Sequence, residues 1–355
     1  MKSIVDEWGK KPKAKAGSLN RQHLLKLEKK EKTRLGKIID TIILLLPFIC
    51  GSIAVFEYTA IPNKTANPFP YRYTAFLCIL ICLYALFVLV SIVKNKLGDF
   101  TFLAKARYLA PLYSAVFLFL ALYDYLTLKT GILTQPFIPC INYIINAGFA
   151  DYALLLECTK NTLVLLFLGY FSGVILGLIT GVLCGYFKKV RYWISPIIKV
   201  LGPIPTVTWV PIMMVIASSL YTGSIFIIAL GSWFAVTVAT MTGITHVNKD
   251  YFEVAKTLGA SSSQLVFKVA IPAAIPSILQ GCTQAMSSAC VSILIAEMLG
   301  VESGLGWYIT WQKSWASYDK MFIAIVIICL IFIAVTKTLD KIKQYLLRWQ
   351  IGERE

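Results

Sequence analysis

The chain has 355 residues, of which 57% are hydrophobic and only 15% are charged. Soluble globular domains use about 25% charged residues, so the composition excludes an ordinary cytosolic enzyme and a disordered chain, and it predicts a polytopic membrane protein. The formal net charge is +16. Because most basic residues flank long apolar runs, we assign this charge to membrane topology and expect no nucleic-acid partner.

The first 37 residues form a lysine-rich tract without an apolar stretch, so we expect no cleaved signal peptide and a cytoplasmic amino terminus. Eight apolar runs follow, each close to the roughly 20 residues that a helix needs to cross a bilayer core. The sequence therefore predicts an all-α integral membrane fold with about eight transmembrane helices. The expected spans are residues 38–57, 74–93, 109–128, 160–187, 195–217, 223–246, 276–299 and 321–339.

The distribution of basic residues predicts the orientation of these spans. Of the 34 lysine and arginine residues, 28 fall in the two termini and in every second loop. Basic residues concentrate on the cytoplasmic side of membrane proteins. We therefore expect both termini in the cytoplasm of a multi-pass protein of the bacterial inner membrane.

Ionisable residues within the spans all lie within about two turns of a predicted helix end, which argues against a proton-coupled carrier or a voltage sensor. Sodium held by backbone carbonyls would escape this test. The residues concerned are Asp124, Lys160, Lys199, His246, Glu297 and Lys337.

Known catalytic and metal-binding patterns are missing from the sequence. It has no G-x-x-x-x-G-K-[ST] phosphate loop and no G-x-S-x-G segment, so we expect no catalytic residues and no ATP hydrolysis on this chain. The nine cysteines show no C-x-x-C pattern and only two histidines are present, so we expect no metal site.

Small residues and prolines mark two further spans. Glycines recur at every fourth position from Gly169 to Gly185, which predicts a ridge for close helix packing. Pro203, Pro205 and Pro211 should break or kink the fifth span. Such a break either lines a solute pathway or is only kinked packing. The candidate pathway residues are Thr206, Thr208, Trp209, Thr237, Ser288 and Glu297.

The segment after the sixth span predicts a compact pair of short helices. Residues 253–258 can form the first helix, and Gly259 permits a positive φ that turns the chain into the second. Pro272 and Pro276 would then bend the chain back into the membrane. An ordinary interfacial hairpin is the alternative.

Residues 296–315 combine an acid with aromatic residues. Glu297 could meet an external protein or gate the outer mouth, or it could be a solvated helix-end acid. The aromatic side chains should form an interfacial belt, with contact to a docking protein as the alternative. These side chains are Trp307, Tyr308, Trp311 and Trp315.

Together these segments resemble permease subunits of binding-protein-dependent ABC importers. Glu253, Ala255, Gly259 and Pro272 have the spacing of the EAA loop, with other apolar residues at the remaining pattern positions. Residues 202–211, 296–298 and 304–309 are similar to segments of the nitrate, sulfonate and taurine group. The resemblance covers roughly residues 130–350.

The resemblance implies a type I importer core in residues 109–355, whose loop at 248–272 couples to a separate ATPase. The candidate contact residues for that ATPase are Tyr251, Glu253, Val254, Ala255, Leu258, Gly259 and Ala260. Residues 38–108 would be an extra pair of spans and residues 1–37 a cytoplasmic basic tail. The implied partners are ATPase subunits that bind ATP and magnesium, a second permease copy, and an extracytoplasmic binding protein. The solute would be a small anion such as a sulfonate, taurine or nitrate. The alternatives are an uncharged vitamin-precursor-like solute, or a carrier or channel independent of ATP.

Overall fold

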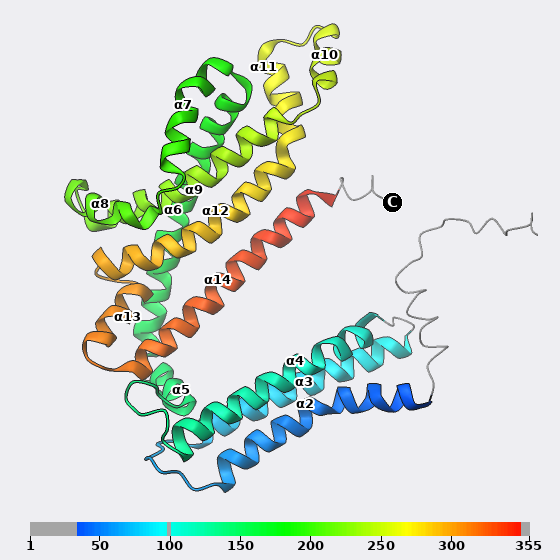
Figure 1. Cartoon of the computed structure of the whole chain (residues 1–355), viewed down its shortest axis with the longest axis vertical. Coiled ribbons are helices and arrows are strands. Elements are labelled where there is room, and N and C mark those ends of the chain that lie inside the picture. Colours follow the sequence, from blue (N-terminus) through cyan, green and yellow to red (C-terminus); the bar gives the residue numbers. More distant parts are fainter. Residues whose placement is uncertain (1–33, 98–100, 349–355) are drawn as a thin grey trace, which may run out of the picture. The chain divides into compact units, whose positions relative to one another are not determined.

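The computed structural model describes residues 34–97 and 101–348, and within these ranges every regular element is a helix (Figure 1). Seven helices are long and apolar enough to cross a membrane, and one further pair, Lys188–Leu201 and Thr206–Met213, passes the same test although it is bent by 92°. The prediction of an all-α fold with about eight spans is confirmed. The predicted basic tail, residues 1–37, lies almost wholly outside the described residues.

The described chain forms two compact units, and the first extends to Thr134 and also includes Cys140–Asn142. It contains α2 (Arg34–Ala60), α3 (Tyr71–Lys96), α4 (Thr101–Asp124) and the short π-helix η1 (Tyr125–Lys129). α4 packs against both α2 and α3. This unit therefore includes α4 as a third candidate span, and residue 108 lies within α4.

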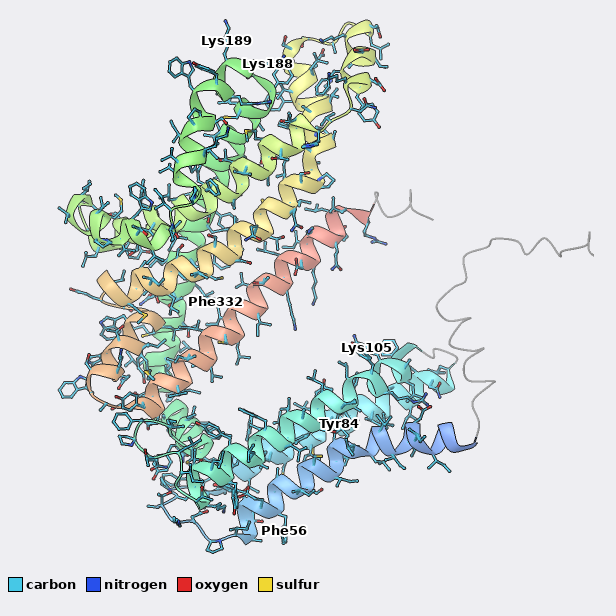
Figure 2. All side chains as sticks on the ribbon, viewed as in Figure 1. Phe56, Tyr84, Lys105, Lys188, Lys189 and Phe332 are labelled. Atoms are coloured by element: carbon cyan, nitrogen blue, oxygen red, sulfur yellow. The ribbon has the colours of Figure 1, made fainter. Side chains whose placement is uncertain are left out.

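Polar contacts tie these three helices together. The Tyr84 hydroxyl on α3 donates to the Leu44 carbonyl on α2 at 2.9 Å, and its ring lies 5.2 Å from that of Tyr113 on α4 (Figure 2). Arg107 on α4 forms a 2.9 Å ion pair with Asp40 on α2. The unit is therefore a packed bundle and not a set of independent spans.

The second unit is built around α6 (Tyr152–Tyr186), α9 (Leu220–Thr245) and α12 (Ile271–Gly300). α9 lies between the other two, and the shared core includes Leu166, Ile228 and Met286. α14 (Tyr318–Leu346) packs against this core through Phe332 (Figure 2). The short helices α5 (Ile141–Ala150) and α13 (Leu305–Ser314) lie at one end of the unit (Figure 1).

The glycine ridge of α6 faces α9 directly. A Cβ atom added at Gly173 would clash with the Ala229 carbonyl oxygen and would lie 2.6 Å from Ser232 Cβ. Added at Gly181, it would lie 2.6 Å from Thr240 Cβ. Only hydrogen side chains permit such backbone contact, so the predicted close packing is confirmed, with α9 as the partner helix.

The proline-rich fifth span is broken into three pieces. α7 (Lys188–Leu201) is followed by a single 3₁₀ turn, η2 (Thr206–Trp209), and by α8 (Val210–Ile216). The 92° bend lies at Pro203 and Pro205, where the missing N–H groups and the fixed φ angles end the helix. The predicted break is confirmed, and it places the candidate residues Thr206 and Trp209 on a turn.

Candidate functional site

The loop after α9 folds as a helix, a tight turn and a second helix start. α10 (Lys249–Thr257) begins at Asn248, whose side-chain oxygen accepts from the Asp250 N–H at 3.1 Å. Beyond its end, Gly259 has φ +80°. The Gly259 N–H donates to the Lys256 carbonyl at 2.9 Å and the Ala260 N–H to the Ala255 carbonyl at 3.0 Å. This pair of bonds is a Schellman motif, so the predicted positive-φ turn at Gly259 is confirmed.

A capping box starts the next helix immediately. The Gln264 N–H donates to Ser261 Oγ at 3.4 Å, and the Ser261 N–H donates to Gln264 Oε1 at 2.8 Å. The turn is therefore capped on both sides by reciprocal hydrogen bonds. Such a turn is fixed by its own sequence and does not depend on contacts elsewhere.

The expected second short helix is not a separate element. α11 (Ser262–Gln264) continues through a π-helical turn, η3 (Leu265–Ala270), into α12, and Ser262–Met298 reads as one helix of 37 residues. Pro272 directly follows the π-helical turn η3 and lies in the interior of this continuous helix, which runs on past it. The prediction that Pro272 and Pro276 redirect the chain was wrong, because the membrane helix already starts at the capping box.

α10 presents two different faces. Phe252 is directed inward and packs with Ile244 and Ala274, at the ends of α9 and α12. On the outer face Tyr251, Val254 and Leu258 are 61%, 59% and 81% exposed. Positions three, four and seven apart share one side of a helix, so these apolar side chains form a continuous surface, which we call the α10 outer face.

The other candidate contact residues flank the α10 outer face. Glu253 and Gly259 are exposed, and Ala255 and Ala260 are half-buried. The structure thus brings all seven candidate contact residues together in one small protruding loop, at the same end of the unit as the α6–α7 turn with Lys188 and Lys189 (Figure 2).

A cavity of about 250 Å³ lies at the bend between α7 and α8. Thr206, Trp209 and Ser288 line it, together with Trp233 and Phe234 of α9. None of the lining side chains in the described structure carries a charge. The Trp233 indole N–H donates to Thr180 Oγ1 at 3.0 Å, so the available polar side-chain groups are hydroxyls and the indole N–H of Trp209, which suit weak binding of a solute better than retention.

Beside the cavity, one hydrogen bond joins α12 to the broken span. The hydroxyls of Thr206 on η2 and Ser292 on α12 lie 2.8 Å apart. Ser288, one turn earlier on α12, lines the cavity directly. A displacement of α12 along its axis would therefore reach the cavity wall.

Three of the six candidate pathway residues lie elsewhere. Thr208 is exposed and does not line the cavity. Thr237 is buried between α9 and α6, where its hydroxyl lies 2.8 Å from that of Thr180. Sequence reasoning missed Trp233 and Phe234, although an aromatic pair directly after Gly231 and Ser232 in an apolar span could have indicated them.

Glu297 is buried, with 1% of its surface exposed. Its Oε2 accepts from the Gly306 N–H at 2.8 Å, and the adjacent Leu305 N–H donates to Thr162 Oγ1 of α6 at 2.9 Å. Gly304 has φ +131°, and a Cβ atom added there would clash with the Glu297 carboxylate. The interpretation of Glu297 as a solvated helix-end acid is wrong, because the loop between α12 and α13 folds back over it. Glu297 holds the first turn of α13 in place.

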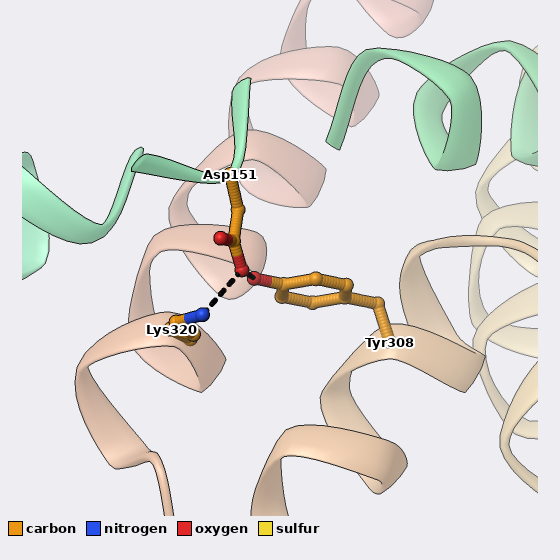
Figure 3. Close-up of polar contacts among 3 residues, drawn as sticks. All are labelled: Asp151, Tyr308 and Lys320. Carbon is orange, nitrogen blue, oxygen red and sulfur yellow. Dashed lines mark hydrogen bonds and ion pairs between the residues drawn. The ribbon is translucent and has the colours of Figure 1, made fainter. Parts of the chain in front are cut away.

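The predicted aromatic belt is only partly exposed. Trp315 and Trp311 are 72% and 40% exposed, whereas Tyr308 is fully buried. The Tyr308 hydroxyl donates to Asp151 Oδ2 at 2.8 Å, and Lys320 Nζ pairs with the same oxygen at 2.8 Å (Figure 3). Burial raises the pKa of Tyr308, and the bond to Asp151 raises it further. The phenol therefore remains a hydrogen-bond donor and links α13 to the start of α6.

Comparison with known proteins agrees with the resemblance found in the sequence, for residues within the second unit. Residues 173–348 match the family model described as binding-protein-dependent transport system inner membrane component. The chain is 30% identical over 183 residues to a putative aliphatic sulfonates transport permease protein of Bacillus subtilis, covering 52% of this chain and 66% of the relative. It is equally similar to a bicarbonate transport system permease protein of Synechococcus elongatus, covering 51% and 64%.

These alignments span slightly less than two thirds of the length of the curated relatives. Among solved structures, the MetNI methionine ABC transporter in an inward-facing conformation is 22% identical with a TM-score of 0.49. That match covers 55% of this chain and 97% of the other.

Proposed function

Residues 173–348 belong to the family of binding-protein-dependent transport system inner membrane components, and on that basis we propose that this chain is the transmembrane subunit of an ATP-driven importer. A separate ATPase docks on the α10 outer face. The observation that carries this proposal is the loop itself: an exposed apolar helix face held at a fixed angle by the Schellman turn and the capping box.

The continuity of the loop with α12 explains how docking would act on the solute. The capping box at Ser261 is the start of the helix that reaches Ser288 and Ser292, roughly 40–45 Å away at 1.5 Å per residue. Closure of the ATPase dimer would move the loop, and α12 would transmit that movement to the cavity at the broken span. ATP binding and hydrolysis remain on the partner, and two permease copies, by default identical, supply two loops.

The distribution of lysine and arginine residues supports an orientation of the second unit in the membrane. The α6–α7 turn and the α10 loop lie at one end of the second unit (Figure 1), and both belong to the set of segments with 28 of the 34 lysine and arginine residues. The positive-inside rule places this end in the cytoplasm, where an ATPase has access to it. The opposite end, with α13, faces the extracytoplasmic binding protein of an inner-membrane importer.

For the solute we propose a small organic or inorganic anion, such as a sulfonate, taurine or nitrate. The relatives named for aliphatic sulfonates and bicarbonate support this class. Hydroxyl and indole N–H donors without a cation would hold an anion only transiently. The two tryptophans that line the cavity favour, as a second candidate, an uncharged aromatic solute such as a vitamin precursor.

Reconstitution tests the proposal. Vesicles containing the purified chain alone should show no concentrative uptake under a sodium or proton gradient, and uptake should require the ATPase, the binding protein and internal ATP. As a matched pair, Leu258→Ser on the α10 outer face should reduce uptake, whereas Trp315→Ser, an equally exposed position on the other end, should leave ATPase docking intact. Gradient-driven uptake by the chain alone would contradict the proposal.

A further inference from the structure

The exposed side of α6 carries an elongated groove that the transport mechanism does not use. Its volume is about 760 Å³, within the range of roughly 300–1,000 Å³ that is typical of small-molecule sites. All of its lining residues belong to α6, between Leu156 and Ile175. Leu168, Phe171 and Ile175 are 47%, 55% and 57% exposed. The groove is therefore an apolar surface that the rest of the second unit leaves uncovered.

A positive charge lies near one end of this groove. Lys160 lines it beside Thr159, and Lys160 is exposed. Glu157, one turn earlier, does not line the groove, and within the described ranges no ion pair joins an acid to Lys160. Ser172, further along, already donates to a backbone carbonyl within α6. A lysine on a lipid-facing surface is costly unless its ammonium group reaches water or an anion.

The length of α6 indicates the depth of this charge in a bilayer. Lys160 and Tyr186 are roughly 39 Å apart at 1.5 Å per residue, and a bilayer with its headgroups is about 40–45 Å thick. With Tyr186 and the neighbouring Lys188 at one membrane surface, Lys160 lies among the headgroups of the other. The apolar part from Leu163 to Ile175 is roughly 18 Å long, which matches one leaflet of a hydrocarbon core about 30 Å thick.

We propose that this groove binds one anionic phospholipid, with the phosphate beside Lys160 and an acyl chain along α6 as far as Ile175. Charge complementarity favours this occupant over an apolar protein helix, because such a helix would bury the ammonium group of Lys160 without a partner. The site involves neither the ATPase nor the solute cavity, so its test does not depend on the proposed transport function.

The test is photo-cross-linking of the full-length chain in nanodiscs that contain equimolar phosphatidylglycerol and phosphatidylcholine with identical acyl chains. A photoreactive residue is placed at Leu168, which lines the groove, or at Leu176, which is 54% exposed on α6 but lies outside it. Phosphatidylglycerol should be enriched about fivefold in the lipid adducts at Leu168, as one lysine near the membrane surface predicts. The adducts at Leu176 should have the bulk lipid ratio. Equal lipid ratios at the two positions would overturn the proposal.

A pair of lysine variants tests the role of the charge. Lys160→Gln should abolish the enrichment at Leu168. Lys313→Gln should leave it unchanged, because Lys313 is exposed on α13 at the same end of the second unit but does not line the groove. Both lysines are exposed, so neither variant disturbs the core. Unchanged enrichment in Lys160→Gln would overturn the proposal, and so would adducts at Leu168 with a second copy or another segment of this chain in place of lipid.

Discussion

Replacement of Gly259 by valine isolates the contribution of the loop turn. The φ angle of Gly259 is +80°, and an added Cβ would meet no atom within 4 Å. The cost is therefore that of the backbone conformation alone, about 1–2 kcal/mol for a left-handed residue and towards the upper end for a β-branched side chain. One to two kcal/mol changes an equilibrium by roughly 5- to 30-fold. In the variant the population of the capped turn should fall by that factor, while all membrane helices remain intact.

The assay is the affinity of the purified ATPase for the reconstituted chain, together with solute-stimulated ATP hydrolysis. Gly259→Val should weaken both by roughly 5- to 30-fold without changing the amount of inserted protein. Gly259→Asn is the matched control, because asparagine tolerates the left-handed conformation, and it should retain most of the affinity. Normal docking and coupling in Gly259→Val would refute the reasoning. Equal losses in both variants would show that side-chain bulk at the interface matters and the turn does not.

Two further predictions concern the packing of the second unit. In Gly173→Leu the added Cβ would clash with the Ala229 carbonyl, so the variant should lower the free energy of unfolding by at least about 2 kcal/mol, measured as a loss of thermal stability in detergent. Ser172→Leu, on the exposed side of α6, should not lower it, and equal stability of both variants would exclude the ridge as a tight contact. Glu297→Ala should lower the free energy of unfolding by about 1–3 kcal/mol, because the buried Gly306 N–H loses its acceptor. Glu297→Gln retains an acceptor oxygen and should lower it less. The opposite order of the two variants in thermal unfolding would contradict the anchoring role.

Features carried by local patterns could be predicted from the sequence. The apolar runs define the spans, because hydrocarbon requires continuous apolar length. Gly259 and the prolines at 203 and 205 act through their own backbone dihedrals, so the turn and the break needed no knowledge of their neighbours. The glycine period of α6 indicated close packing, but only the structure identified α9 as the partner.

Features that depend on chain segments folding over one another were not predictable. Glu297 is near a helix end, and its burial arises because Gly304–Gly306 returns across it. Tyr308 is buried because Asp151, 157 residues earlier, meets its hydroxyl. Asp124 is also near a helix end, which suggested exposure at the headgroups, yet the packing of three helices encloses it.

Two further features were not predictable for similar reasons. They are the packing of α4 in the first unit and the continuity of the loop helix with α12. α4 passes the same length and hydropathy test as the later spans, and hydropathy alone does not show that it packs against α2. Pro272 was interpreted as a break, but the helix begins at the capping box of Ser261 and continues past Pro272. Pro272 directly follows the π-helical turn η3, which the sequence pattern did not indicate.

The most direct test of the central claim is cross-linking from single positions of the loop to the ATPase. A photoreactive residue at Leu258, which is 81% exposed on the α10 outer face, should form an adduct with the ATPase subunit in membranes. The same probe at Trp315, 72% exposed near the opposite end of the second unit, should form none. An ATPase adduct at Trp315 but not at Leu258 would contradict the account.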